Sequence, residues 1–207
     1  YKPLFSSLSF STMDKNTLYK NMESPVHGSQ TRRLLVRYLF VTGNVLPPHE
    51  GSRFYYAGEG GCFNGGFMTM KMILHTPDRF AAAFPICEDL PDAVITDEDI
   101  QSIAHLPIWF THAKTDTTVR PSQFVIPTYK RLVEAGNTNV HFTFWDKVLD
   151  STGLYTTEAG APFEYIGHWS WIPMLNNECT LDYDGSPVTI DGNPVTILEW
   201  MAAQKKV

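Results

Sequence analysis

The chain has 207 residues, of which 43% are hydrophobic and 18% are charged, and its formal net charge at pH 7 is −6. This composition is typical of a globular protein with one substantial core, and it excludes a largely disordered chain. The acidic balance and the lack of a Lys/Arg cluster argue against nucleic acid as a partner. The apolar run 34–41 is shorter than the roughly 20 residues of a membrane span and contains Arg37, so we expect no membrane span.

Three cysteines are present, Cys62, Cys87 and Cys179, and none of them forms a Cys-x-x-Cys pair or has a histidine at ligand spacing. We therefore expect no zinc site and no cofactor. One disulfide with a remaining thiol is one interpretation of the three. We favour the interpretation that all three cysteines are buried and act as small hydrophobic residues.

The first part of the chain, residues 1–52, carries few signals apart from a candidate buried strand at 34–41. It shows no signal peptide and no starting Met, which predicts a processed or truncated N-terminus.

From residue 53 onwards, strand-like and helix-like segments alternate. Apolar or alternating runs predict strands at 54–58, 81–86, 107–111 and 140–145. Helical patterns lie at 67–75, within 91–103, at 124–135 and at 197–205. The helix at 67–75 is apolar almost all round and is expected to be buried. This alternation predicts an α/β fold, with a mostly parallel sheet covered by helices on both faces.

A glycine-rich turn joins the first of these strands to the first of these helices. The segment Gly61-Cys-Phe-Asn-Gly65 fits the Gly-x-nucleophile-x-Gly frame of a nucleophile elbow, but Phe63 stands where a serine is expected. Asp116 follows a later strand, and His168 ends a later loop. Nucleophile, acid and histidine in this order are typical of a hydrolase triad, in which imidazole accepts the hydroxyl proton and a carboxylate fixes the imidazole tautomer.

Three motifs carry a resemblance to a known family. Gly-Cys-Phe-Asn-Gly-Gly-Phe-Met at 61–68, Thr-His-Ala-Lys-Thr-Asp at 111–116 and Gly-His-Trp-Ser-Trp at 167–171 resemble those of secreted bacterial α/β-hydrolase esterases related to polyhydroxybutyrate depolymerases, a group that includes feruloyl and carboxyl esterases. The resemblance covers residues 53–203, within one domain expected over 1–207. It implies a small or polymeric ester substrate and a secreted, extracellular location, and it leaves the oligomeric state open.

Carried over by position, the family's roles fall on three residues. Asp116 would be the triad acid, His168 the general base, and the backbone N–H of Asn64 one oxyanion donor. Trp169 and Trp171 would line an apolar pocket, although core packing explains both tryptophans equally well.

The chain departs from the family at two places. Phe63 has no proton to give and no lone pair with which to attack, and residues 1–52 lack a His-Gly-Gly-Gly motif. The N-terminal strands of the fold are therefore expected to be missing or divergent. Phe63 itself has three interpretations: an inactivated hydrolase, a serine misread as phenylalanine, or a structural residue in a protein that was never an enzyme. The intact Asp116 and His168 motifs argue against the last.

Two functions from different classes follow. The first is a serine-type carboxylic ester hydrolase scaffold that works through an acyl-enzyme and is inactive as written. The second is a non-catalytic pseudo-hydrolase that binds a ligand in the same cleft. Cys62, one position before the apex of the elbow, is a weak third candidate as a thiol nucleophile.

Overall fold

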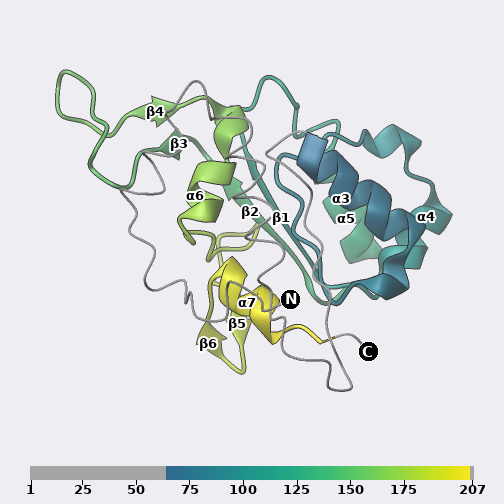
Figure 1. The fold of residues 1–207 in the computed structure, drawn as a ribbon. Coiled ribbons are helices and arrows are strands. Elements are labelled where there is room, and N and C mark those ends of the chain that lie inside the picture. The colour runs from purple at the N-terminus through teal and green to yellow at the C-terminus, as the bar shows by residue number, and fades with distance from the viewer. Residues whose placement is uncertain (1–63, 206–207) are drawn as a thin grey trace, which may run out of the picture.

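The structure is a computed structural model that describes residues 64–205 (Figure 1). The expected strands at 34–41 and 54–58, together with Cys62 and Phe63, lie outside these residues. No helix in the described range is long and apolar enough to cross a membrane.

The order of elements agrees with the predicted alternation from residue 64 onwards. The helices are α3 (Asn64–His75), α4 (Asp97–Ile103), α5 (Val125–Glu134), α6 (Trp171–Leu175) and α7 (Ile197–Ala203). Short 3-10 turns lie at η2 (Pro77–Arg79), η3 (Asp92–Val94) and η4 (Gly167–Trp169). The strands are β1 (Ile108–Ala113), β2 (Val140–Trp145), β3 (Val148–Leu149), β4 (Glu164–Tyr165), β5 (Thr189–Ile190) and β6 (Asn193–Pro194).

Strands β1 and β2 form a parallel sheet of two strands, in a register that begins with Ile108 opposite Val140. The segment 83–87 lies along β1 in the same direction, with parallel bridges from Ala83 to Ile108 and from Ile86 to Thr111. The continuous strand predicted at 81–86 is therefore wrong. Pro85 has no N–H to donate, so the segment pairs with β1 only in isolated bridges. The other sheets are antiparallel ribbons, β3–β4 and β5–β6.

Helices cover both faces of the β1–β2 pair (Figure 1). On one face, Ile108 and Phe110 join an apolar cluster with residues of α3, α4 and α5, among them Met70 and Leu132. On the other face, Trp109 packs in a second cluster with residues of α6 and α7. Alternate residues of β1 therefore enter opposite cores, as expected for a strand whose two faces are both buried.

The helix predicted at 67–75 is present, but it begins at Asn64 and is not buried all round. Gly65, Gly66, Thr69, Met70 and Ile73 form its buried face, whereas the Met68 side chain is 40% exposed. Gly66 has to be a glycine here, because a Cβ would lie 2.5 Å from the Ile86 carbonyl oxygen and 2.6 Å from the Glu88 Cα. The absence of this side chain lets the first turn of α3 lie directly on the backbone of 86–88.

The later helices match the prediction more closely. Helix α5 ends before Gly136, whose φ of +87° is the left-handed conformation expected after a helix end. Helix α7 buries Ile197, Trp200 and Met201. Cys87 and Cys179 are both buried, in agreement with the favoured interpretation for these two cysteines, whereas Cys62 lies outside the described residues.

Candidate active site

Asp116 lies in the turn that follows β1, at the carboxyl end of the parallel strands, where α/β proteins place their functional groups. Its side chain is buried, and its Oδ1 accepts hydrogen bonds from the N–H groups of Thr118 at 2.8 Å and Val119 at 2.9 Å. Burial alone raises the pKa of Asp116, but hydrogen bonds from His112, His168 and the Val119 N–H outweigh it and hold the pKa well below its usual value. The side chain is therefore a fixed carboxylate.

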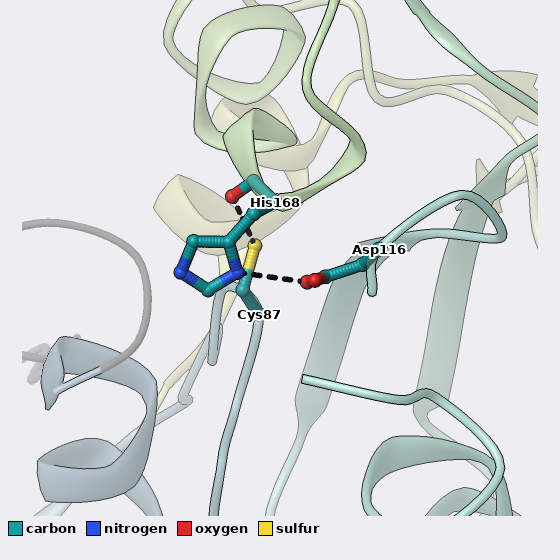
Figure 2. A group of neighbouring side chains, drawn as sticks. All are labelled: Cys87, Asp116 and His168. Carbon is teal, nitrogen blue, oxygen red and sulfur yellow. Dashed lines mark hydrogen bonds and ion pairs between the residues drawn. The ribbon is translucent and has the colours of Figure 1, made fainter. Parts of the chain in front are cut away.

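His168 lies in η4, and its Nδ1 is 2.9 Å from Oδ2 of Asp116. The ring is mostly buried, with 14% of the side chain exposed. Figure 2 shows that the other ring nitrogen points away from the carboxylate. A carboxylate at Nδ1 favours the tautomer in which Nδ1 carries the proton and Nε2 can accept one. The structure thus brings together the predicted acid and the predicted base in the geometry of an acid–base pair.

Gly167 allows the histidine turn to lie against the acid turn. A Cβ at this position would lie 2.3 Å from the Thr115 carbonyl carbon and 2.5 Å from the Asp116 backbone nitrogen. Both neighbours are backbone atoms and cannot rotate away, so any side chain at position 167 would push the two turns apart.

The substitution Gly167→Ala is therefore expected to destabilise the fold by about 1–3 kcal/mol, the usual cost of overpacking, and to weaken the contact between Asp116 and His168. Urea denaturation measures the loss of stability. The NMR chemical shifts of the His168 ring protons report the weakened contact with Asp116. Gly160→Ala is the matched control, because a Cβ there meets nothing within 4 Å. It is expected to cost about 1 kcal/mol through its positive φ and to leave the His168 signals unchanged. Equal effects at both sites would contradict the steric role of Gly167.

His112 is a second imidazole on the same carboxylate. Its Nε2 lies 3.0 Å from Oδ2 of Asp116 and 3.0 Å from the Val119 carbonyl oxygen, and its side chain is fully buried. Nδ1 is buried and has no partner among the described residues, so the ring proton belongs on Nε2, which faces two acceptors. His112 therefore holds the Asp116 carboxylate in place. The sequence analysis gave His112 no role.

Cys87 and Ser170 support the histidine turn, and the sequence analysis assigned neither of them a role. The Cys87 thiol donates to the carbonyl oxygen of His168 at 3.2 Å, and its sulfur lies 2.8 Å from Oγ of the buried Ser170. Because the thiol has one proton, the Ser170 hydroxyl is the donor in the second contact. Cys87 has a φ of 44°, a left-handed conformation that costs a non-glycine residue about 1–2 kcal/mol.

Two further carboxyl groups follow Cys87. Burial raises the pKa of Asp89, and the proximity of His168 lowers it in part. Glu88 is fully buried; burial raises its pKa well above the usual value, against a hydrogen bond from the Leu90 N–H. Its Oε1 has no hydrogen-bond partner within the part of the chain that the structure describes. Burial thus favours the protonated form of Glu88, which lies beside the first turn of α3.

The raised pKa of Glu88 predicts a pH-dependent effect of Glu88→Gln. A carboxyl whose pKa is higher in the folded state destabilises the fold progressively as pH rises above its unfolded pKa of about 4.3. The amide has no proton to lose, so the variant is expected to be more stable than the parent at pH 8, by more than the ~0.5 kcal/mol of an ordinary surface change, and to lose this advantage near pH 4. Urea midpoints at both pH values test this, with the exposed Glu98→Gln as control. A gain that is the same at both pH values would contradict it.

The remaining predicted site residues lie around this pair. Asn64 is the first residue of α3, where the backbone N–H groups have no partner within the helix, but no contact tests its role as an oxyanion donor. Trp169 is 38% exposed, and its ring centroid lies 6.3 Å from that of Trp171 and 6.1 Å from that of Tyr165. Phe63 precedes the described residues, so its placement is not tested.

Comparisons with known proteins complete this description. No family model matches the chain. No curated protein matches it either. One solved structure that it resembles is described as a thermostable esterase, with 28% sequence identity and a TM-score of 0.42 over 57% of this chain. The match spans only about a quarter (27%) of that esterase, and a TM-score this low does not establish a shared fold.

Proposed function

We propose that this chain is a serine-type carboxylic ester hydrolase scaffold of the α/β-hydrolase kind, whose chemistry is interrupted because position 63 holds phenylalanine. The observation that carries the proposal is the 2.9 Å contact between Nδ1 of His168 and the buried Asp116 carboxylate. A secreted location and a small or polymeric ester substrate belong to the same proposal.

The position of α3 supports this assignment. Gly66, in its first turn, lies against the backbone of Ile86 and Glu88, and Cys87 between them contacts the carbonyl oxygen of His168. The start of α3 and the His168 turn are therefore neighbours, although they are far apart in the sequence. A nucleophile elbow carries its nucleophile immediately before such a helix, and position 63 immediately precedes Asn64.

The chemistry of the proposed reaction uses each of these parts. A serine hydroxyl at position 63 gives its proton to Nε2 of His168 while its oxygen attacks the ester carbonyl carbon. Asp116 stabilises the imidazolium that forms, and the N–H groups at the start of α3 stabilise the oxyanion. The C–O bond to the alcohol then breaks, and the alcohol leaves with the proton from His168. Water repeats these steps on the acyl-enzyme and releases the acid.

Restoring serine at position 63 tests the proposal with p-nitrophenyl acetate and butyrate as substrates. Phenylalanine supplies neither the attacking oxygen nor the proton, so the chain as written is expected to hydrolyse these esters at the background rate. Activity that appears only with serine would support the hydrolase scaffold.

The exposed ring of Trp169 beside an intact acid–base pair favours the second candidate, a pseudo-hydrolase that binds a ligand without turning it over. In that case the unmodified chain binds p-nitrophenyl butyramide, a stable amide analogue of the ester. Isothermal titration calorimetry of the unmodified chain and of Trp169→Ala tests this. Binding that Trp169→Ala abolishes, combined with no gain of turnover after serine is restored, would select the binding protein over the hydrolase.

A further inference from the structure

Three potential metal ligands from distant parts of the chain meet beside the candidate active site. The Cys87 sulfur, a carboxylate oxygen of Asp116 and a ring nitrogen of His168 all lie within 4.8 Å of one another (Figure 2). Cys87 ends the segment 83–87 that pairs with β1, Asp116 follows β1, and His168 lies in η4. The spacing rule that excluded zinc from the sequence could not detect this group, because its members lie in three different loops.

Sulfur, imidazole nitrogen and carboxylate oxygen are the donors that zinc uses in proteins, and three protein ligands with one open position are typical of its non-structural sites. Zn–ligand bonds of about 2.0–2.3 Å place the ligands of a tetrahedron about 3.3–3.6 Å apart. Here the Asp116 Oδ2 and His168 Nδ1 atoms are 2.9 Å apart, and the widest separation among the three ligand atoms is at most 4.8 Å. Shifts of roughly 1 Å or less, within the reach of side-chain rotations, would therefore form the site.

The carboxylate is already supported as a metal ligand needs to be. Its Oδ1 accepts the N–H groups of Thr118 and Val119, and its Oδ2 is 3.0 Å from Nε2 of His112. These bonds do not involve His168, so they can persist when the His168 ring turns toward a metal. Ser170, 2.8 Å from the Cys87 sulfur, can likewise donate to a thiolate. Outer partners of this kind orient metal ligands and strengthen binding.

We propose that Cys87, Asp116 and His168 form a binding site for Zn²⁺, and that zinc bound there switches off the hydrolase centre. Binding forms S–Zn, N–Zn and O–Zn bonds, and the thiol proton passes to solvent. A neutral His168 keeps its single proton on the ring nitrogen that does not bind the metal. Zinc thus breaks the hydrogen bond between His168 and Asp116 on which proton transfer depends. The inhibitory part rests on the proposed function; the metal binding does not.

Co²⁺ is the probe for the site, because it replaces Zn²⁺ and reports a thiolate ligand through a near-ultraviolet charge-transfer band. Titration of the full-length Phe63 chain with CoCl₂ is expected to produce this band together with the visible bands of a tetrahedral ion, and ZnCl₂ is expected to abolish both. Cys87→Ala should remove the charge-transfer band, and His168→Ala should weaken cobalt binding about tenfold or more. If Cys87→Ala does not fold, Cys87→Ser replaces it, since a hydroxyl can keep the contacts to the His168 carbonyl and to Ser170.

Two matched controls remove the other cysteines. Cys179 is fully buried, and burial raises the pKa of its thiol to about 12. Cys179 should therefore not bind the metal, and Cys179→Ala should retain the cobalt spectrum. Cys62 is not one of the three proposed ligands, so Cys62→Ala should retain the spectrum as well. No charge-transfer band in the parent chain, or a band that persists in Cys87→Ala, would overturn the metal site.

The inhibitory part is tested in the Phe63→Ser protein. Zinc is expected to stop ester hydrolysis, EDTA to restore it, and Cys87→Ser to raise the half-inhibiting zinc concentration about tenfold or more. Cobalt binding with a thiolate band but without inhibition would overturn the switch and leave the metal site standing. If Phe63→Ser proves inactive, the proposed hydrolase function and the switch fail together, whereas the cobalt spectra of the Phe63 chain still decide the metal site.

Discussion

Replacing Phe63 with serine is expected to raise the hydrolysis of p-nitrophenyl butyrate by roughly 10⁴-fold or more over the Phe63 chain. The buried Asp116 carboxylate and the His168 ring are already paired at 2.9 Å, and serine at position 63 would supply the attacking oxygen that phenylalanine lacks. Michaelis–Menten kinetics of the two chains, measured at the same pH, give the comparison.

Two variants separate this gain from unrelated effects. Phe63→Ala removes the ring without adding a hydroxyl, and it should remain at the background rate. Phe63→Ser combined with His168→Ala should lose the gain, because no base then accepts the serine proton. A folded Phe63→Ser protein that is no faster than Phe63→Ala would contradict the hydrolase scaffold.

Asp116→Asn is expected to lower the kcat of the Phe63→Ser protein by about 10⁴-fold, the loss seen when a triad carboxylate becomes an amide and the histidine adopts the wrong tautomer. The same substitution should destabilise the fold at neutral pH, because the carboxylate accepts hydrogen bonds from two N–H groups and two imidazoles. The pKa of Asp116 is lowered in the folded state, so its stabilising contribution is complete above the unfolded pKa of about 3.9 and is lost as pH falls toward the folded value.

Asp150→Asn is the matched control for this prediction. Asp150 is also buried, with its pKa lowered because hydrogen bonds from Thr152 and Tyr165 outweigh the effect of burial, and its carboxylate does not contact the Asp116–His168 pair within the described part of the chain. It should lose stability but keep kcat within a few fold. Equal kcat losses in Asp116→Asn and Asp150→Asn would show that instability, not the loss of the triad acid, explains the Asp116 effect.

The sequence predicted the elements that position the site, because their signals are local. Gly136 ends α5, the acidic segment 91–103 holds α4, and alternation marks β2. The motifs at 111–116 and 167–171 also predicted Asp116 and His168 as partners, and the structure places their side chains 2.9 Å apart.

What the sequence missed depends on contacts between distant segments. Gly167 matched a motif, but the motif does not explain why a glycine is required. The backbone of Thr115 and Asp116 leaves no space for a Cβ, and this contact between distant segments cannot be predicted from sequence periodicity. His112 was given no role, because the expected strand beside it does not reveal that a second imidazole contacts Asp116. Cys87 could have been found, because it follows the segment 81–86 at the same sheet edge as the acid, and the rule applied to Asp116 applies equally to it.

The burial of α3 was predicted wrongly for a different reason. The predicted helix was read as apolar all round, yet Lys71 is exposed and Met68 is 40% exposed. Only Gly65, Gly66, Thr69, Met70 and Ile73 are fully buried, while Phe67, Met72 and Leu74 pack against the core with part of their surface exposed. Two of these are glycines, whose burial reflects close backbone packing and adds little to an apolar count.

Covalent labelling of the Phe63→Ser protein with a fluorophosphonate tests most directly whether Asp116 and His168 serve a nucleophile at position 63. This reagent forms a stable phosphonate ester with an activated serine and expels fluoride. Peptide mass spectrometry is expected to find one label per chain at position 63 and none after His168→Ala is added. Labelling elsewhere, or labelling at position 63 that is equally fast without His168, would contradict the assignment of this pair as a hydrolase centre.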